Sequence, residues 1–438
     1  MNIDKKYIEL FNEYAGRIKD EKLSEVSKCS MSIKVSDVLF AYVMNVNGTK
    51  PIIESDIIIE GMISVSENKE AELYRQLYIM KVDARAVIHA FPDNACTVGN
   101  AKVIIPAMLD DMAQIIGPDA RYSENDNTAI LKVLKKRNAC MITGNGVLTY
   151  GRSLDEAYVG CLVLEKSAKC LIDTTVLGGY TKIKFVETLL MHYIYQKKYS
   201  KLNQLNKQKE LDGNSEQKAV AKPTFSDTEM NLRQQVKDAG VRLLNSNLVQ
   251  GTWGNISIRL DDKHMLITPT ALDYLSLTPE DMVVVNLDTM EYSGLHKPSG
   301  ERDIHAELLR TRKDINVVMH SHPTECSAFA AARVDMAVIS DEMQKYVKGD
   351  AKVSDYGLPS TKKLAKMTVA AMEGRNACFM ANHGMLSVGA TIDEAFETCR
   401  VMEESARATI DQMTLKLSNA KTPSDRRKEI FLRKCSKA

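Results

Sequence analysis

The chain has 438 residues, of which 44% are apolar and 26% are charged, and its formal net charge is +1. These values are typical of a globular protein with two or three domains, and they exclude an overall field that attracts nucleic acid or an anionic membrane. The sequence has no run of about 18 apolar residues, no secretory signal at its start, and no C-x-x-C pair among nine cysteines. We therefore expect a cytoplasmic protein with reduced thiols that binds neither nucleic acid nor membrane.

The two halves of the chain resemble each other, with a repeat of about 200 residues, the size of a whole domain. Four segments of the first half match four segments of the second in the same order. The pairs are 32–35 with 257–260, 86–92 with 317–323, 137–140 with 375–378, and 144–151 with 382–389. Both copies of the last segment run into a helix with an N-terminal capping pattern, at Ser153 and at Thr391.

The copies differ where the second carries histidines. Phe91 stands in the place of His322 and Asn145 in the place of His383, so that His89 alone remains. One imidazole cannot hold a catalytic zinc ion, which requires about three protein ligands. We therefore expect the first domain, residues 1–195, to be a copy without a metal site.

Residues 196–225 are rich in Lys, Gln and Asn and poor in aromatic residues. This composition buries little surface and predicts a polar linker. Ser226 and Glu229 then form a capping box at the start of a helix. The second domain is expected to cover residues 226–438.

The second copy has a candidate metal site. The apolar run 317–319 predicts a short buried strand, and the histidines that follow it, His320 and His322, project to the same face because strand residues alternate. His383 follows a second apolar run, 377–380, at a turn. Three imidazoles without an obvious fourth ligand indicate an open, catalytic site. A lone histidine usually lies on the surface or forms hydrogen bonds without binding a metal ion, and two histidines at this spacing could occur by chance. The prediction of a metal site therefore depends on the third histidine.

Three loops of the second copy are suited to binding an anion. Residues 251–257 contain two glycines with Thr and Asn, residues 268–270 read Thr-Pro-Thr, and residues 297–301 read Lys-Pro-Ser-Gly-Glu. Glycine lets backbone N–H groups approach an anion, and Glu301 opens a predicted helix, 302–310, whose N-terminal end is positive. Taken singly, a loop of Gly, Thr and Asn is more often an ordinary turn, and a glutamate at the start of a helix more often interacts with the helix dipole.

Taken together, these motifs resemble the class II aldolase/adducin family over residues 226–410, and residues 1–190 resemble a degenerate copy of it. The resemblance rests on Gly-Thr-x-Gly-Asn-Ile-Ser, Ile-Thr-Pro-Thr, Lys-Pro-Ser-Gly-Glu, His-Ser-His and Asn-His-Gly, in that order. It implies the α/β class, with two tandem α/β/α domains that each have a central, mainly antiparallel sheet and helices on both faces.

The resemblance also implies roles for individual residues. His320, His322 and His383 match the zinc ligands, Glu301 matches the catalytic acid/base, and Tyr356 matches a proton-donating tyrosine that acts across a subunit boundary. The phosphate-binding set is matched by five residues: Thr252, Gly254, Asn255, Thr270 and Ser299. Ala271 and Gly300 depart from the family pattern, and the tail after residue 410 has no tyrosine, which leaves phosphate affinity and the exact substrate open.

The implied function is a zinc-dependent aldolase that cleaves a ketose phosphate, similar to fuculose 1-phosphate, to dihydroxyacetone phosphate and an aldehyde. Mn²⁺, Co²⁺ and Fe²⁺ are alternatives, since imidazole binds them all. The family's pentulose-phosphate 4-epimerases carry Asp where this chain has Glu301, which favours an aldolase or a sugar-phosphate dehydratase. A non-catalytic, adducin-like interaction protein would need neither the histidines nor Glu301.

Family enzymes form cyclic tetramers, so the resemblance implies a homo-oligomer, and two copies in one chain would let a dimer imitate a ring of four domains. In such a ring the tyrosine that reaches the second-copy site could come from the first copy. There Asn125 occupies the Tyr356 position, with Tyr122 three residues earlier.

Overall fold

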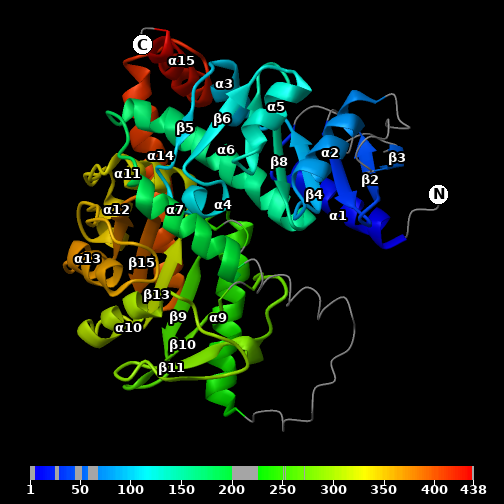
Figure 1. Cartoon of the computed structure of the whole chain (residues 1–438). Coiled ribbons are helices and arrows are strands. Elements are labelled where there is room, and N and C mark those ends of the chain that lie inside the picture. The colour runs from blue at the N-terminus through cyan, green and yellow to red at the C-terminus, as the bar shows by residue number, and fades with distance from the viewer. Residues whose placement is uncertain are drawn as a thin grey trace. The chain divides into compact units, whose positions relative to one another are not determined.

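The computed structural model describes residues 5–24, 29–44, 52–57, 68–199, 225–249, 251, 253–270 and 272–436. The chain divides into two compact units (Figure 1). Unit 1 comprises residues 1–172, 184–192 and 428–438, and unit 2 comprises residues 173–183 and 193–427. Most of the expected linker, residues 200–224, lies outside the described residues, so the domain limits given above remain predictions.

The helices and strands of both halves follow the order of the sequence. The first half contains α1 (Lys5–Asp20), β1 (Ser30–Lys34), β2 (Leu39–Met44), β3 (Ile52–Ile57), α2 (Lys69–Met80), β4 (Ala86–Ala90), α3 (Asp93–Asn100), β5 (Ile105–Pro106), α4 (Asp110–Ile115), β6 (Asp119–Ser123), α5 (Asn127–Leu134), β7 (Ala139–Ile142), β8 (Val147–Gly151), α6 (Leu154–Val176), α7 (Phe185–Ile194) and the π-helical turn Tyr195–Tyr199. The second half contains α9 (Asp227–Asn245), β9 (Asn255–Arg259), β10 (His264–Ile267), the 3-10 turn Pro279–Asp281, β11 (Val283–Asn286), β12 (Tyr292–Ser293), α10 (Arg302–Thr311), β13 (Val317–Ser321), α11 (Thr324–Ala332), α12 (Asp341–Val347), α13 (Lys362–Met372), β14 (Ala377–Met380), β15 (Gly384–Gly389), α14 (Ile392–Leu415) and α15 (Pro423–Cys435).

Unit 1 is built on a sheet with the strand order β3-β2-β1-β4-β8-β7-β6-β5. Neighbouring strands are antiparallel except β6 and β7, which are parallel. Helices α2 and α5 pack on one face through a buried apolar cluster that includes Leu77, Ile130 and Val87. Helix α6 lies on the other face, where the Thr149 hydroxyl of β8 donates to the carbonyl of Ala157 at 2.8 Å.

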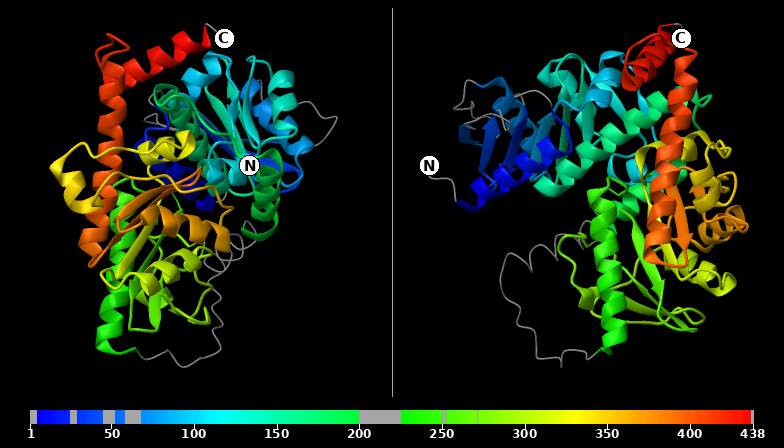
Figure 2. Two further views of the ribbon diagram at one scale, coloured as in Figure 1. Left: turned by 90° about the vertical axis from the view of Figure 1, so that its left-hand side faces the viewer. Right: turned by 180° about the vertical axis from the view of Figure 1, so that it is seen from behind.

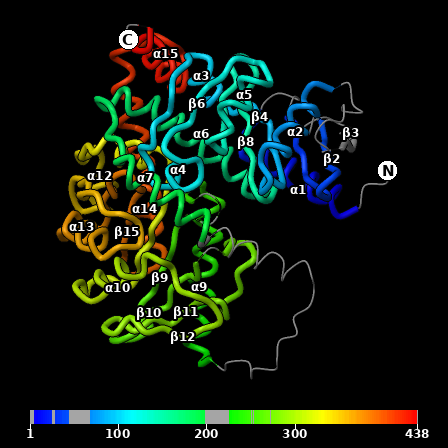
Figure 3. Tube along the Cα trace, viewed as in Figure 1, coloured from blue at the N-terminus to red at the C-terminus, as the bar shows by residue number. Residues whose placement is uncertain are grey.

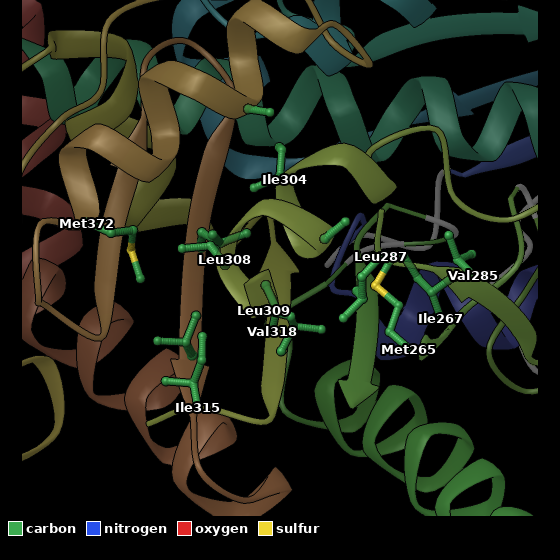
Figure 4. Close-up of a cluster of buried hydrophobic side chains, with 14 of the residues drawn as sticks. Met265, Ile267, Val285, Leu287, Ile304, Leu308, Leu309, Ile315, Val318 and Met372 are labelled. Atoms are coloured by element: carbon green, nitrogen blue, oxygen red, sulfur yellow. The ribbon is translucent and has the colours of Figure 1, made fainter. Parts of the chain in front are cut away.

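Unit 2 is built on an antiparallel sheet with the order β12-β11-β10-β9-β13-β15-β14. Helices α10 and α13 cover one face, and Figure 4 shows Leu308 and Leu309 of α10 against Val318 of β13 within this core. Helices α11 and α14 cover the other face, where Phe329 stacks on Phe379 of β14 at a centroid distance of 5.2 Å. Figure 2 shows α9 and α14 on the same side of the strands.

The two sheets share one strand register at the centre. Ser30 of β1 pairs with His89 of β4, and Asn255 of β9 pairs with His320 of β13 in the same way. The next strand repeats the pattern, since His320 pairs with Leu386 as His89 pairs with Leu148. The chain is therefore a tandem repeat of one α/β/α fold, as the sequence predicts, and Figure 3 traces both copies along the chain.

All nine cysteines carry free thiols, and seven of them are buried. None of the helices in the described part of the chain has the length and apolar character that crossing a bilayer requires.

Candidate metal centre and active site

Two predicted metal ligands lie at the end of β13. Ser321, between them, points to the α14 face of the sheet, where its Oγ lies 3.1 Å from Cys399 Sγ. Because alternate strand residues project to opposite faces, His320 and His322 both project toward α10. They are 1% and 5% exposed, so their imidazoles are shielded from bulk water.

The third predicted ligand comes from the turn between β14 and β15. Asn382, directly before His383, adopts a left-handed conformation with φ +59°, which asparagine tolerates better than most residues. Its side chain is held on both sides: Arg333 donates to Oδ1 at 2.9 and 2.7 Å, and Nδ2 donates to the Thr181 carbonyl at 2.7 Å. This fixed turn directs His383 back toward the end of β13.

The three imidazoles converge through their Nε2 atoms. Nε2 of His320 lies 2.8 Å from that of His322 and 3.1 Å from that of His383. His320 donates from Nδ1 to the Met385 carbonyl at 2.8 Å, which leaves the lone pair of its Nε2 facing the centre of the cluster. Within the described residues, these histidines form the one group of His, Cys, Asp or Glu side chains with metal-ligand spacing.

Two of the three nitrogen–nitrogen separations are close to those around a small divalent cation, and all three ligand nitrogens lie within 4.8 Å of one another. Nitrogen ligands of tetrahedral zinc, with Zn–N bonds of about 2.0–2.1 Å, lie about 3.3 Å apart. The observed separations of 2.8 and 3.1 Å are within a few tenths of an ångström of that value. Three buried lone pairs this close together repel one another, so a cation or a proton at the centre stabilises the arrangement.

Glu301 lies against two of the three rings. It is the N-cap residue of α10, and its Oε1 and Oε2 lie 3.0 Å from His383 Nε2 and 3.3 Å from His320 Nε2. Burial alone would raise the pKa of Glu301, but positive charge at His320 and His383 and hydrogen bonds from His383 and Asn255 hold that pKa well below its usual range. That positive charge belongs to the protonated forms of the two rings, and a cation held by their neutral forms would act in the same direction, so the carboxylate is ionised in either case.

A second layer of side chains holds Glu301. Asn255 donates from Nδ2 to Glu301 Oε2 at 3.0 Å, and its Oδ1 contacts Nε2 of His305. His305, in α10, is fully buried, and its Nδ1 lies 2.7 Å from the Ser257 hydroxyl. His305 was not among the residues predicted from the sequence, although it follows Glu301, the N-cap residue of α10, by one helical turn, a spacing that brings two side chains to the same face of a helix.

The equivalent place in unit 1 is closed by hydrogen bonds. Glu70 Oε1 accepts from Ser30, from the Tyr74 hydroxyl at 2.7 Å and from His89 Nδ1 at 2.5 Å. His89 Nε2 faces the Asn145 carbonyl at 2.6 Å, so both ring nitrogens face acceptor oxygens and neither is available to a metal ion. Glu70 was not predicted from the sequence as the counterpart of Glu301. The spacing could have identified it, because Glu70 precedes His89 by 19 residues, just as Glu301 precedes His320.

The predicted phosphate-binding residues lie on neighbouring segments of unit 2. Thr270 N–H donates to the Lys297 carbonyl at 3.0 Å, and Ser299 N–H donates to the Thr268 carbonyl at 3.1 Å, so the two loops run side by side. The Ser299 hydroxyl accepts from Glu301 N–H at 3.2 Å at the start of α10.

Gly254 has a positive φ of +117°, and a Cβ there would lie 2.9 Å from the His320 carbonyl oxygen. This position therefore requires glycine, because the loop passes directly over the backbone of a candidate metal ligand. Thr252 lies outside the described residues.

Tyr356 lies in the loop between α12 and α13. The Arg333 guanidinium stands 5.6 Å from the centre of its ring, and the same Arg333 holds Asn382 beside His383. Tyr356 is thus connected to the histidine cluster through Arg333.

Two α/β/α units, one with three converging histidines beside a buried glutamate, define a duplicated fold with one candidate metal centre. The family model described as Class II Aldolase and Adducin N-terminal domain matches residues 30–172 and 234–410. The chain belongs to the class II aldolase and adducin family, whose aldolases are metal-dependent lyases.

Similar curated proteins are sugar-phosphate aldolases. A 5-methylthioribulose-1-phosphate/5-deoxyribulose-1-phosphate aldolase of Rhodospirillum rubrum is 33% identical over 175 residues, which cover 40% of this chain and 78% of that protein. An L-fuculose phosphate aldolase of Methanococcus maripaludis is 32% identical over 174 residues, or 40% of this chain and 93% of that protein. Among solved structures, an L-fuculose 1-phosphate aldolase is 28% identical, with a TM-score of 0.41, over 48% of this chain and 97% of that chain.

Proposed function

We propose that unit 2 catalyses the reversible aldol cleavage of a ketose 1-phosphate to dihydroxyacetone phosphate and an aldehyde. The observation that carries the proposal is the convergence of three imidazole Nε2 atoms with the Glu301 carboxylate at their side. The names of the similar proteins, which act on 5-methylthioribulose 1-phosphate, 5-deoxyribulose 1-phosphate and fuculose phosphate, support a ketose 1-phosphate as the substrate class.

His320, His322 and His383 would hold a divalent cation, which we propose is zinc, with Mn²⁺, Co²⁺ and Fe²⁺ as alternatives. Such an ion supplies Lewis-acid stabilisation of the negative charge that develops on the substrate oxygens when the carbon–carbon bond breaks. The role of the chain is to present three neutral nitrogens at the right spacing, and the Met385 carbonyl sets the required tautomer of His320.

Glu301 is proposed to move the proton at C3 of the substrate. In the cleavage direction the C4 hydroxyl gives its proton to a base on the aldehyde side, the C3–C4 electron pair passes into the C2 carbonyl as the aldehyde departs, and Glu301, which enters this direction protonated, gives its proton to C3. In the reverse direction the ionised carboxylate removes that proton. Tyr356 is proposed to exchange the hydroxyl proton on the aldehyde side.

The phosphate group is proposed to bind to Thr252, Gly254, Asn255, Thr270 and Ser299. The positive end of α10 lies beside this set, because Glu301 is the N-cap residue of α10 and its N–H donates to the Ser299 hydroxyl. Fixing the phosphate holds the C3–C4 bond at a constant position relative to Glu301, which accelerates the reaction by orientation.

We further propose that the chain is a homo-oligomer, with Tyr356 or a first-copy residue such as Tyr122 reaching a site on a neighbouring chain. Light scattering of the purified protein tests this directly. A dimer or a larger ring supports the proposal, and a stable monomer rules it out.

The test of the function is Glu301→Gln, which keeps the shape of the side chain and removes its charge. We expect one metal ion per chain to remain bound, and kcat for retro-aldol cleavage to fall by about 100-fold or more, the usual range for loss of an acid/base group. The matched control is Glu70→Gln at the equivalent position of unit 1, which should leave kcat unchanged. Substrates should include 5-deoxyribulose 1-phosphate and fuculose 1-phosphate, with the aldehyde product measured by a coupled reductase.

Unchanged turnover in Glu301→Gln would remove this residue from the mechanism. If wild-type protein with bound metal cleaves no ketose 1-phosphate, the same samples should be assayed for epimerisation and dehydration. Either activity would replace the aldolase proposal.

A further inference from the structure

The buried side chains behind Glu301 form a chain of hydrogen bonds with a defined direction. Asn255 donates from Nδ2 to Glu301 Oε2 at 3.0 Å, which turns its amide oxygen away from the carboxylate. The Asn255 oxygen therefore faces Nε2 of His305, which must carry the proton. Nδ1 of His305 is then an acceptor, and the Ser257 hydroxyl at 2.7 Å donates to it.

The environment of His305 is suited to this neutral form. The ring is fully buried. Burial, reinforced by positive charge at His320 and only partly offset by Glu301, lowers the pKa of His305 to about 3. A neutral imidazole with a single N–H has one orientation that satisfies both neighbours, so the ring fixes which way the Asn255 amide points.

Unit 1 has a different residue at the position that corresponds to His305. Tyr74 replaces His305, and Ser30 replaces Asn255. Tyr74 lies 2.5 Å from the Ser30 hydroxyl and donates to Glu70 at 2.7 Å, so the carboxylate is turned directly onto His89. In unit 1, where Tyr74 occupies this position, Oε1 of Glu70 accepts hydrogen bonds from Ser30, Tyr74 and His89. In unit 2, where His305 occupies it, Glu301 receives a single amide hydrogen bond, from Asn255.

We propose that His305 is a positioning residue: through Asn255 it holds the Glu301 carboxylate in the orientation that catalysis requires. The inference rests on the proposed function, because the effect appears in the turnover that Glu301 supports. It assigns no contact between His305 and the substrate or the metal ion.

The test compares two substitutions at one position. His305→Leu has a similar volume and no donor, whereas His305→Gln keeps an N–H that can reach the Asn255 oxygen. We expect kcat to fall about 10- to 100-fold in the Leu variant, with metal content unchanged, and most of that loss to be restored in the Gln variant. A purely structural residue would lower Tm in both variants and leave kcat unchanged. Tyr74→Phe, at the equivalent position of unit 1, is the control and should retain full turnover.

A double-mutant cycle identifies the path of the effect. If His305 acts through Asn255, then Asn255→Ala and Asn255→Ala/His305→Leu should have the same kcat within about twofold. Fully additive losses, or a Leu variant with wild-type kcat, would overturn the inference. Should the Leu variant fail to fold, His305→Gln and Ser257→Ala complete the comparison, with near-wild-type kcat expected for Gln and a partial loss for Ala.

A spectroscopic measurement separates failure of this inference from failure of the aldolase proposal. Nitrogen-15 NMR of histidine-labelled, metal-loaded protein should show one neutral ring protonated at Nε2 that is lost in His305→Gln and perturbed in Asn255→Ala. This result holds even if no ketose phosphate is cleaved. A ring protonated at Nδ1, or one that is insensitive to Asn255, contradicts the inference whatever the reaction.

Discussion

Gly384 lies beside the proposed metal ligands His320 and His322, and its replacement by alanine should disturb them in a predictable way. A Cβ at this position would lie 2.5 Å from the Ser321 carbonyl oxygen, 3.3 Å from His322 Cγ and 3.4 Å from His320 Cε1. The first of these atoms belongs to the backbone of β13 and cannot turn aside, so β13 and β15 must separate locally. Overpacking of this kind costs about 1–3 kcal/mol of folding free energy.

The same displacement moves both ligands carried by β13. The nitrogen atoms of His320 and His322 are 2.8 Å apart, and a shift of a few tenths of an ångström at Ser321 changes that spacing directly. Because metal ligands depend on their surroundings for orientation, we expect the affinity for zinc to fall about 10- to 100-fold. Competition with a chromogenic chelator measures this affinity, and urea unfolding measures the stability.

Gly146 provides the matched control, since it is the equivalent glycine of unit 1. It has a φ of +76°, and a Cβ there would collide with the Ala90 carbonyl oxygen and lie 2.9 Å from the Phe91 ring. Gly146→Ala should therefore destabilise unit 1 at least as strongly, and leave zinc affinity and turnover unchanged. Equal zinc affinity in Gly384→Ala and wild-type protein would refute the reasoning, because the clash would then be absorbed without moving the ligands.

Two further predictions concern metal removal and pH. Zinc added at about 100 times its Kd to chelator-treated protein should stabilise unit 2 by about 2.7 kcal/mol and raise its Tm, whereas His322→Ala should abolish the shift in calorimetry. Burial and the neighbouring Glu325 carboxylate raise the pKa of Glu403 from 4.5 to about 8, so the folded chain holds an extra proton and the free energy of unfolding should fall as pH rises between those values. In Glu403→Gln that decline should be weaker by up to a few kcal/mol in urea titrations, and an unchanged pH profile would exclude Glu403 as its source.

Much of the site follows from local patterns in the sequence. The alternation of strand residues predicts that His320 and His322 lie on one side of β13, and the turn after the apolar run 377–380 predicts that His383 can point back at them. The expected strand 377–380 agrees with β14, and the expected helix start at Ser226 is confirmed by its hydrogen bond to Glu229 N–H. Such features depend on a few consecutive residues.

The functional residues that could not be predicted from the sequence are defined by contacts between segments that are distant in the chain. In the sequence, nothing distinguishes His305 from other helix residues. Its role becomes visible only in the structure, where Asn255 and Ser257 of β9 contact its ring. Glu70 is likewise recognised as the counterpart of Glu301 only through its contact with His89. The role of Tyr356 stays a prediction, because a residue that acts across a subunit boundary is defined by a neighbouring chain.

The most direct test of the three-histidine site is the metal stoichiometry of purified protein, measured by mass spectrometry of the elements after exposure to zinc and removal of loosely bound ions. Convergence of His320, His322 and His383 predicts one ion per chain, none in His383→Ala, and one in His89→Ala. Two ions per chain, or an ion that persists in His383→Ala, would contradict a single centre formed by these three imidazoles.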